Sequence, residues 1–371
     1  VKYLSEIGAC TMTNLTLNNG FSVSPIPGIN FLTDVPNSLY LRNVNMLNQA
    51  SNYLNANSAV DRTLVKIDEI VSYFECVNST FNQSLLSAEY THTFILKNLH
   101  YLIHQSTFIC CGNRNHDTIP CILSDNKNGN INDIDITISS CKFIECRNKN
   151  FTIRTNNRVF NFINNTMYNP QIDIGFGILV SESCILVVDG CNFTNIGKKD
   201  SNFGGALALD FTQSNIKEQI TVSNCVFDNC TALNSGSIRL NMHKTIPILY
   251  NITFKNMTNN LIASIAYSDS VIFKTIVIDS CNFIKCTNTA RDYGGSGISV
   301  TNARLEGNVY RTFIDFVGCK FINNTSQFQG GAFGLGYNKE DKSKTLQFIG
   351  CEFIGNRVDE VTFPDYGDDG G

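Results

Sequence analysis

The 371-residue sequence contains no tryptophan, only 7 prolines and 5 histidines, and no strong excess of either charge. Its formal net charge is −4 and its longest basic run is Lys198-Lys199, so the positive surface typical of nucleic-acid-binding proteins is missing. No apolar stretch approaches the roughly 20 residues that a membrane helix needs. We therefore expect neither a nucleic-acid partner nor direct insertion of this segment into a membrane.

Asparagine is the most abundant residue, with 48 copies, and phenylalanine, with 26, is the most frequent aromatic residue. Asparagine tolerates the left-handed backbone conformation of tight turns, and a hydrophobic content of 43% is enough to bury a large core. This composition favours stacked strands with polar turns over helices.

The chain is built from copies of the tripeptide Cys-x-Phe, whose first residue is numbered zero below. In the clear copies the residues at positions minus five and minus three are apolar, as Ile136 and Ile138 are before Cys141, which is typical of a strand with one buried face. The six clear copies begin at Cys141, Cys191, Cys225, Cys281, Cys319 and Cys351. Weaker copies begin at Leu15, Val44, Ser79, Ser106 and Ile252.

A glycine corner followed by an alternating strand recurs after several copies, at Gly204, Gly236, Gly294 and Gly330. Each repeat thus supplies about three short strands within about 30 residues, without any persistent helical period. The pattern predicts an all-β protein, a right-handed parallel β-helix of about 11 coils with three short strands per coil. We expect one domain over residues 1–371, with an insertion at 147–172, that was excised from or continues into a longer chain.

Position plus five predicts an interior ladder. Cysteine occupies it at Cys111, Cys146, Cys230 and Cys286, and asparagine is assigned to it at Asn165, Asn324 and Asn356. Stacked coils would place these side chains above one another. The pairs Cys141/Cys146, Cys225/Cys230 and Cys281/Cys286 fit two interpretations, disulfides across one corner of a coil or free thiols in the core, and the sequence leaves both open.

Eleven Asn-x-Ser/Thr sequons occur. Asn164, Asn229, Asn256 and Asn323 are assigned to position plus four, on the solvent side of a turn, and are predicted glycosylation sites together with Asn78 and Asn192. With 15 cysteines in the chain, this favours the secretory pathway and an extracellular or cell-surface location.

Two short motifs carry a family resemblance. Gly-Gly-Ala plus an aliphatic or aromatic residue occurs at residues 204–207 and 330–333, and Phe-x-x-Asn occurs at 162–165, 321–324 and 353–356. Their alternation resembles the repeat of the polymorphic outer-membrane proteins of chlamydiae, whose relatives also occur on the surfaces of some protists. The resemblance implies a right-handed β-helix exposed at a cell surface and often used for adhesion, here in a eukaryotic, protist relative. Several Phe-x-x-Asn sites carry cysteine instead of asparagine.

Signals for chemistry are weak. The phenylalanines between the paired cysteines are expected in the core, which disfavours a zinc or redox pair, and phosphate loops and Gly-x-Ser-x-Gly elbows are absent. We expect no enzyme activity, no cofactor and no metal, and predict an adhesin or structural surface rod that binds a host or cell-surface ligand, glycans among them, or associates end to end into filaments. The alternative is a carbohydrate-active β-helix enzyme, a polysaccharide lyase or glycosidase, because Asp133 and Asp135 should both point outward, and Asp189, Asp279 or Asp315 would join them under favourable stacking.

Overall fold

The structure is a computed structural model of the whole chain, and all described residues lie in strands, turns or short connections. It describes residues 2–5, 9–18, 21–22, 29–33, 37–47, 50–51, 63–67, 71–82, 92–96, 100–111, 121–124, 135–146, 152–155, 159–170, 177–181, 185–198, 205–211, 219–232, 237–242, 247–257, 274–288, 298–300, 312–326, 330–335 and 344–359.

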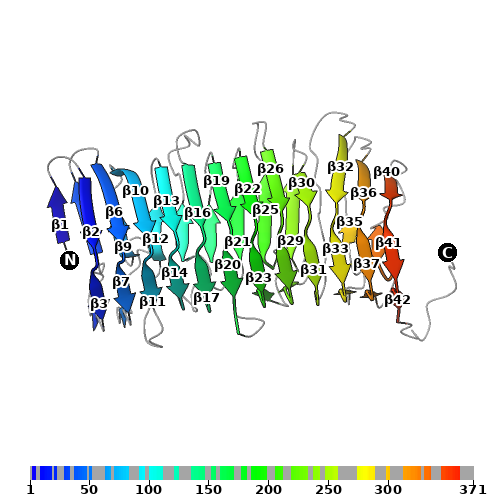
Figure 1. Cartoon of the computed structure of the whole chain (residues 1–371), viewed down its shortest axis with the longest axis horizontal. Helices are drawn as coiled ribbons and strands as arrows, with labels where there is room; N and C mark the ends of the chain where they lie inside the picture. Colours follow the sequence, from blue (N-terminus) through cyan, green and yellow to red (C-terminus); the bar gives the residue numbers. More distant parts are fainter. Residues whose placement is uncertain are drawn as a thin grey trace, which may run out of the picture.

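Three long parallel sheets run along a rod that has the N-terminus at one end and the C-terminus at the other (Figure 1). Sheet A contains β1 (Lys2–Ser5), β5 (Ile29–Thr33), β9 (Thr63–Ile67), β12 (His92–Leu96), β15 (Ile122–Ser124), β18 (Ile153–Thr155), β21 (Ile178–Ser181), β25 (Leu207–Phe211) and β29 (Ile238–Met242). Sheet B contains β2 (Ala9–Thr13), β6 (Asn37–Arg42), β10 (Val71–Val77), β13 (His100–His104), β16 (Asp135–Ser139), β19 (Val159–Ile163), β22 (Ile185–Asp189), β26 (Gln219–Ser223), β30 (Pro247–Tyr250), β32 (Lys274–Asp279), β36 (Thr312–Val317) and β40 (Lys344–Ile349).

Sheet C follows sheet B within each coil. It contains β3 (Thr16–Asn18), β7 (Asn45–Leu47), β11 (Thr80–Asn82), β14 (Thr107–Ile109), β17 (Lys142–Ile144), β20 (Thr166–Tyr168), β23 (Asn192–Thr194), β27 (Val226–Asp228), β31 (Thr253–Lys255), β33 (Asn282–Ile284), β37 (Lys320–Ile322) and β41 (Glu352–Ile354). Short strands then pair as β4 (Phe21–Ser22) with β8 (Ala50–Ser51), β24 (Gly197–Lys198) with β28 (Thr231–Ala232), β34 (Thr287–Asn288) with β38 (Thr325–Ser326) and β42 (Arg357–Val358), and β35 (Ile298–Val300) with β39 (Phe333–Leu335).

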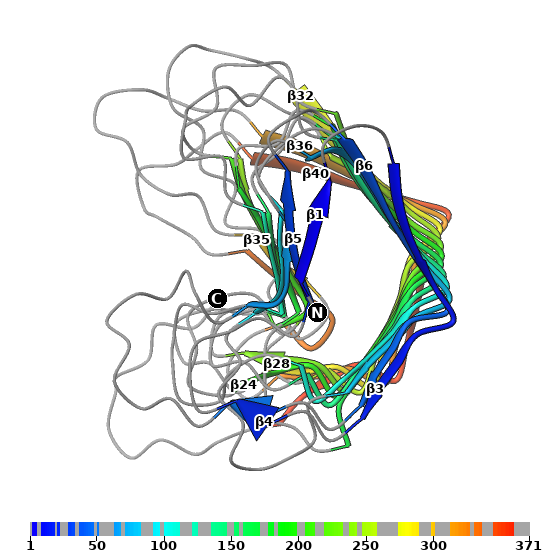
Figure 2. The ribbon, with the colours of Figure 1, turned by 90° about the vertical axis from the view of Figure 1, so that its left-hand side faces the viewer.

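The predicted fold is confirmed, because every strand pair is parallel and joins one coil to the next. Seen from the N-terminal end, the chain runs clockwise through sheet B, sheet C and sheet A while it moves away from the viewer, so the β-helix is right-handed (Figure 2). Sheets B and C each contain 12 strands in coil order.

The predicted insertion at 147–172 is wrong, because this segment provides strands of the three sheets. β18 pairs with β15 and β21, β19 with β16 and β22, and β20 with β17 and β23. The segment looked too short for a coil because Asn165, which occupies its position zero, follows Cys141 by only 24 residues. A coil needs only its strands and turns, and the connections between them absorb differences in length. Sheets B and C therefore hold one strand more than the 11 coils predicted.

Phenylalanines occupy position plus two in most coils and stack inside the rod, with Met167 in this position between Phe143 and Phe193. Neighbouring rings such as Phe108 and Phe143, Phe193 and Phe227, or Phe283 and Phe321 are parallel to within 10° with centroids 4.8–4.9 Å apart. This separation matches the spacing of hydrogen-bonded strands, so one ring per coil stacks without strain.

The first corner of each coil lies between sheets B and C, at position minus one. Residues there have φ values near +55°, as Asn43 (54°), Asn78 (48°) and Asn251 (50°) do, and the corner N–H donates to the carbonyl of the next coil. A second corner at position plus four repeats this conformation at Asn229, Asn256 and Asn323, among others. Asparagine suits both corners because it tolerates φ > 0 better than other residues with a side chain do.

The corner amides also bond to one another along the rod. At the first corner Asn78 Nδ2 donates to Asn43 Oδ1 at 2.7 Å, and Asn43 Nδ2 donates to Asn14 Oδ1 at 2.9 Å. At the second corner Asn229 Nδ2 donates to Asn195 Oδ1 at 2.8 Å. The asparagine ladders of this β-helix thus lie mainly on its outer edges.

The glycine corners of the sequence have a steric origin. A Cβ on Gly331 would meet the backbone of Arg357 in the next coil at about 2.5 Å, closer than real Cβ contacts come. The second glycine of this Gly-Gly-Ala motif therefore allows a neighbouring strand to approach its backbone.

Lys285 occupies a corner position that is asparagine in the two adjacent coils. It sits at the second corner with φ 52°, between Asn256 and Asn323 of the adjacent coils. Because this conformation costs most L-residues about 1–2 kcal/mol, Lys285→Asn should raise the free energy of unfolding by about 0.5–1 kcal/mol in urea titrations. Lys142→Asn is the same change at an exposed position of strand β17, and it should not raise the free energy of unfolding. An equal gain in stability from both variants would contradict this account.

Candidate functional site

Position zero carries a chain of hydrogen bonds through the interior. The backbone N–H at this position lies between two strands, and in several coils a side chain of the next coil accepts its hydrogen bond. Ser106 N donates to Cys141 Sγ at 3.4 Å, Cys141 N to Asn165 Oδ1 at 2.7 Å, and Asn165 N to Cys191 Sγ at 3.4 Å. Serine, cysteine and asparagine are interchangeable here because each offers an acceptor atom of small size.

The same side chains donate to the preceding coil. Asn165 Nδ2 donates to Ile138 O at 2.8 Å, and Cys191 Sγ donates to Phe162 O at 3.2 Å. A buried carbonyl at the end of sheet B is thereby satisfied in each case.

Position plus five repeats this arrangement at the second corner. Cys286 Sγ donates to the carbonyl of Phe254 at 3.7 Å, and Asn324 Nδ2 donates to that of Phe283 at 3.0 Å. The acceptor is the stacked phenylalanine of the preceding coil in both cases. Cysteine and asparagine alternate in the repeat because they make the same hydrogen bond.

The structure separates the three asparagines assigned to one ladder. Asn324 and Asn356 lie on adjacent coils at position plus five, and Asn324 Nδ2 donates to Asn356 Oδ1 at 2.9 Å. Asn165 instead occupies position zero, and Asn164 therefore lies at the first corner and not at plus four. Asn165 was assigned to position plus five because residues 162–165 have the same Phe-x-x-Asn motif as 321–324 and 353–356. In residues 162–165, however, the motif lies at the end of a sheet B strand, whereas in the other two copies it lies at the end of a sheet C strand.

None of the six paired cysteines forms a disulfide in the structure, and all six are buried. Cys141, Cys225 and Cys281 occupy position zero, whereas Cys146, Cys230 and Cys286 occupy position plus five. The members of each pair lie at opposite ends of one sheet C strand, and they make separate hydrogen bonds to carbonyls, as Cys141 does to Ser139 O at 3.3 Å and Cys146 to Ile144 O at 3.8 Å.

Burial makes these thiols poor nucleophiles. Desolvation raises the pKa of Cys76, Cys141 and Cys230 to about 12, so they stay protonated at neutral pH. Thiolates rather than thiols attack substrates and bind metals, and these three cysteines therefore act as core groups with weak hydrogen bonds. Within the described part of the chain, no three His, Cys, Asp or Glu side chains are placed to hold a metal ion.

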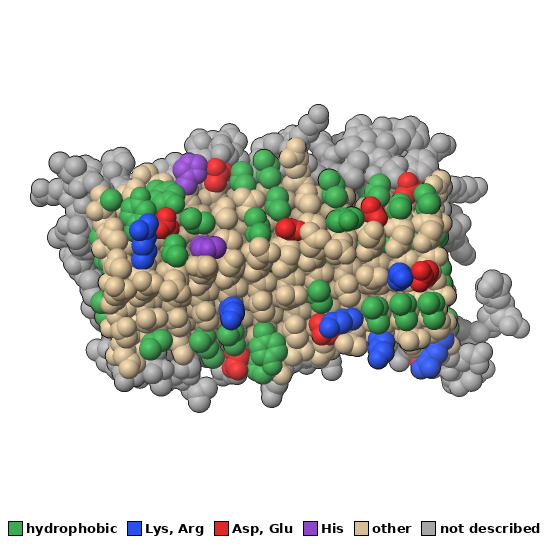
Figure 3. Space-filling view, viewed as in Figure 1, with side chains coloured by type: hydrophobic (Ala, Val, Ile, Leu, Met, Phe, Trp, Pro, Cys, Tyr) green, Lys and Arg blue, Asp and Glu red, His purple; other side chains and the backbone are tan. Residues whose placement is uncertain are grey.

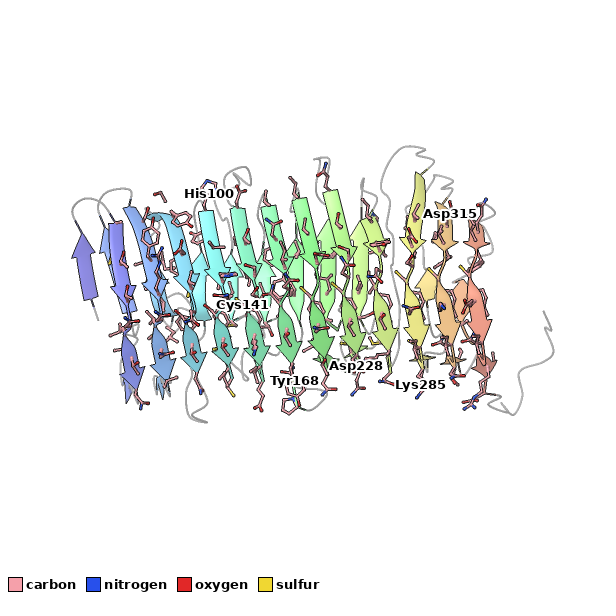
Figure 4. All side chains as sticks on the ribbon, in the orientation of Figure 1. His100, Cys141, Tyr168, Asp228, Lys285 and Asp315 are labelled. Carbon is pink, nitrogen blue, oxygen red and sulfur yellow. The ribbon has the colours of Figure 1, made fainter. Side chains whose placement is uncertain are left out.

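The outward acidic residues of sheet B are spread along the rod. Asp135 begins β16, Asp189 ends β22, and Asp279 and Asp315 lie on β32 and β36, while Asp133 lies outside the described residues. Figure 4 shows how far apart His100, beside Asp135, and Asp315 lie along the rod. The predicted convergence of Asp135 with Asp189, Asp279 or Asp315 is therefore wrong, because Asp135 lies in a different row of sheet B from the other three.

Of these four aspartates, Asp135 lies beside a histidine. His100 Nδ1 lies 3.3 Å from Asp135 Oδ2 on the next coil, where both side chains are partly exposed. The aspartates Asp189 and Asp279 instead accept hydrogen bonds from serine hydroxyls, at 2.7 Å from Ser223 and 2.8 Å from Ser280.

A cluster of aromatic and charged residues on β6 and β10 was not predicted. The Arg42 guanidinium donates to Glu75 Oε1 from Nε at 2.9 Å and from Nη2 at 2.7 Å, and it lies 5.3 Å from the centroid of the Tyr40 ring. The Tyr73 ring contacts the Tyr40 ring with the centroids 5.7 Å apart and the planes tilted by 47°, and the Tyr73 hydroxyl donates to Glu75 Oε2 at 3.2 Å. We call Tyr40, Arg42, Tyr73 and Glu75 the Arg42 cluster.

The Arg42 cluster is a fixed polar surface near the N-terminal end of sheet B, in the region where Figure 3 shows basic, acidic and hydrophobic side chains together. Burial and the Glu75 carboxylate raise the pKa of the Tyr73 hydroxyl, which keeps it a hydrogen-bond donor. The sequence provides little indication of this cluster, because its residues lie at the outward positions minus six, minus four and minus two of two weak repeat copies.

No protein-family model, curated protein or solved structure matches this chain. The described residues also include no helix long and apolar enough to cross a membrane.

Asn324 allows a test of the interior ladder. Its side chain is fully buried, donates to Phe283 O and accepts a 2.9 Å hydrogen bond from Cys286 N. Asn324→Ala should lower the free energy of unfolding by about 2–4 kcal/mol, because it leaves two buried backbone groups unpaired. Asn324→Cys should cost clearly less, since thiols fill this position in other coils.

The comparison is made by urea titration with Asn282→Ala as a control on the outer face of β33, where the same substitution should cost less than about 0.5 kcal/mol. Equal losses for Asn324→Ala and Asn324→Cys would refute the shared hydrogen-bonding role.

Proposed function

We propose that this chain is a non-enzymatic extracellular or cell-surface β-helix that serves as an adhesin or a structural rod, as the resemblance to the surface proteins of chlamydiae and protists implies. The proposal rests mainly on the contrast between the repeated residues, which stabilise the stack, and the acidic residues, which are not repeated. Every repeated feature, from the phenylalanine column to the corner asparagines, supports the stack, whereas the acidic side chains of sheet B are not repeated from coil to coil.

The Arg42 cluster is the surface best suited to adhesion. Its two rings and its bidentate ion pair are held in place by one another, so a ligand would meet them with little loss of side-chain entropy. Aromatic faces with neighbouring charged hydrogen-bonding groups suit polar ligands such as glycans.

The predicted glycosylation sites differ in access. Asn78 and Asn164 at the first corner, Asn256 and Asn323 at the second, and Asn192 on β23 are exposed, whereas Asn229 is half-buried. A corner amide keeps one N–H after glycosylation, so the hydrogen bond from Asn78 to Asn43 is compatible with a glycan.

Secretory expression tests the location. Placed behind a heterologous signal peptide in eukaryotic cells, the chain should be secreted with glycans at several of the five exposed asparagines and less at Asn229. Asn324 also begins a sequon but is fully buried, so the folded protein should carry no glycan there. Glycopeptide mass spectrometry measures each site, and retention of the chain without any glycan would count against the proposal.

The carbohydrate-active alternative rests on one observation, the contact between His100 and Asp135. A carboxylate beside an imidazole is a plausible acid–base pair, although glycosidases use two carboxylates. Under the proposed function, a panel of polysaccharides should show no cleavage by the wild-type chain. Cleavage that is lost in Asp135→Asn and kept in Asp315→Asn would establish the enzyme and overturn the proposal.

A further inference from the structure

Position zero is cysteine in two neighbouring coils at two places along the rod. The strand register on both sides of this position makes Cys225 the counterpart of Cys191, and Cys319 the counterpart of Cys281. All four side chains lie in the core and are at most 1% exposed. Each place therefore brings two thiols from different coils together in the interior.

The two thiols of each place contact one another. Desolvation and then the hydrogen bond with the Cys225 thiol raise the pKa of Cys191. The hydrogen bond with the Cys319 thiol is the main cause of the raised pKa of Cys281, ahead of desolvation. These contacts join cysteines of adjacent coils, whereas the cysteine pairs noted in the sequence lie within one coil.

The separation of the coils suits a disulfide at both places. Phe193 and Phe227 lie two residues after Cys191 and its counterpart, and their ring centroids are 4.8 Å apart. The corresponding rings at the second place, Phe283 and Phe321, are 4.9 Å apart. Counterparts at this spacing fall within the Cα separations of about 4.4–6.8 Å that disulfides span.

The cysteine pairs within one coil do not have this geometry. Cys225 and Cys230 lie on either side of β27, and the three residues of such a strand alone rise by about 10 Å. That distance exceeds the limit of about 7 Å between the Cα atoms of bridged cysteines. A disulfide across the corner of one coil therefore does not fit the structure.

We propose that Cys191 forms a disulfide with Cys225, and Cys281 with Cys319, so that neighbouring coils of the rod are joined covalently. The reaction is thiol–disulfide exchange, with a small-molecule or protein disulfide as the oxidant. One cysteine thiolate attacks the oxidant, which forms a mixed disulfide and releases one thiol, and the second cysteine thiolate then displaces the other thiol. The cysteine pair loses two protons and two electrons, and the disulfide of the oxidant is reduced to two thiols.

The inference rests on the proposed function for its oxidant, because the secretory pathway supplies such disulfides and the cytosol keeps thiols reduced. All four thiols are buried in the folded chain, so the exchange has to take place before the adjacent coils close around them. The two disulfides join residues 34 and 38 positions apart in the sequence. Each would restrict the unfolded chain and thereby stabilise the stack.

The test refolds the 371-residue chain from urea in a mixture of oxidised and reduced glutathione. Remaining thiols are alkylated after denaturation, and disulfide-linked peptides are mapped by mass spectrometry without reduction. Both proposed disulfides should be found, and the oxidised chain should unfold at a higher urea concentration than the same chain kept reduced. Cys141, whose counterparts are Ser106 and Asn165, should be alkylated. Alkylation of all four paired cysteines, or a bond between Cys225 and Cys230, would overturn the proposal.

Two matched variants identify the partner of Cys191. Cys225→Ser should fold, because serine occupies position zero at Ser106, and it should leave Cys191 alkylated and lower the urea midpoint of the oxidised chain. Cys230→Ser removes the other cysteine of the same repeat and should keep the disulfide between Cys191 and Cys225. Loss of that disulfide in both variants would contradict the assignment.

The refolding experiment supplies its own oxidant, so it separates the pairing from the location of the protein. Failure of the cysteines to pair counts against the disulfides alone. Secretion without any glycan, in contrast, counts against the proposed function and leaves the pairing in refolded protein unaffected.

Discussion

Everything in this structure depends on the stacking of each coil on the next in strict register. The hydrogen bonds of three parallel sheets set the spacing between coils, and each residue therefore lies above its counterpart. An inward-facing residue is acceptable only if its side chain fits between those of its counterparts in the two adjacent coils. Flat aromatic rings meet this condition at position plus two, and isoleucine or valine meets it at the inward positions of sheet B, as Ile136 and Ile138 do.

At each corner the backbone turns, and the coils must stay in register through the turn. The left-handed residue at each corner directs its N–H to the next coil, but the N–H that follows it lies between two strands and needs a side-chain acceptor. Small polar residues at positions zero and plus five solve this from inside the core. Among the described residues, only Thr231 Oγ1 is a buried side-chain oxygen or nitrogen without a hydrogen-bond partner.

The sequence predicts the fold because the register makes each coil repeat the same pattern. It does not predict which of two similar corners a motif occupies, since both end an apolar strand and both accept asparagine or cysteine; Asn165 was misplaced for this reason. The Arg42 cluster was missed for the opposite reason. Outward positions carry no repeated constraint, so contacts such as that between Tyr40 and Tyr73 exist only once and leave no pattern to read.

This difference between inner and outer positions also bears on function. A stack that specifies its interior so fully leaves its outer faces free to vary, and a binding surface can be built from residues of two adjacent coils without loss of stability. The register sets no limit to the number of coils, because each coil presents to the next the same kind of strand edge on which it is itself stacked. Rigidity along the axis and variability of the outer faces therefore have the same origin, the register between coils.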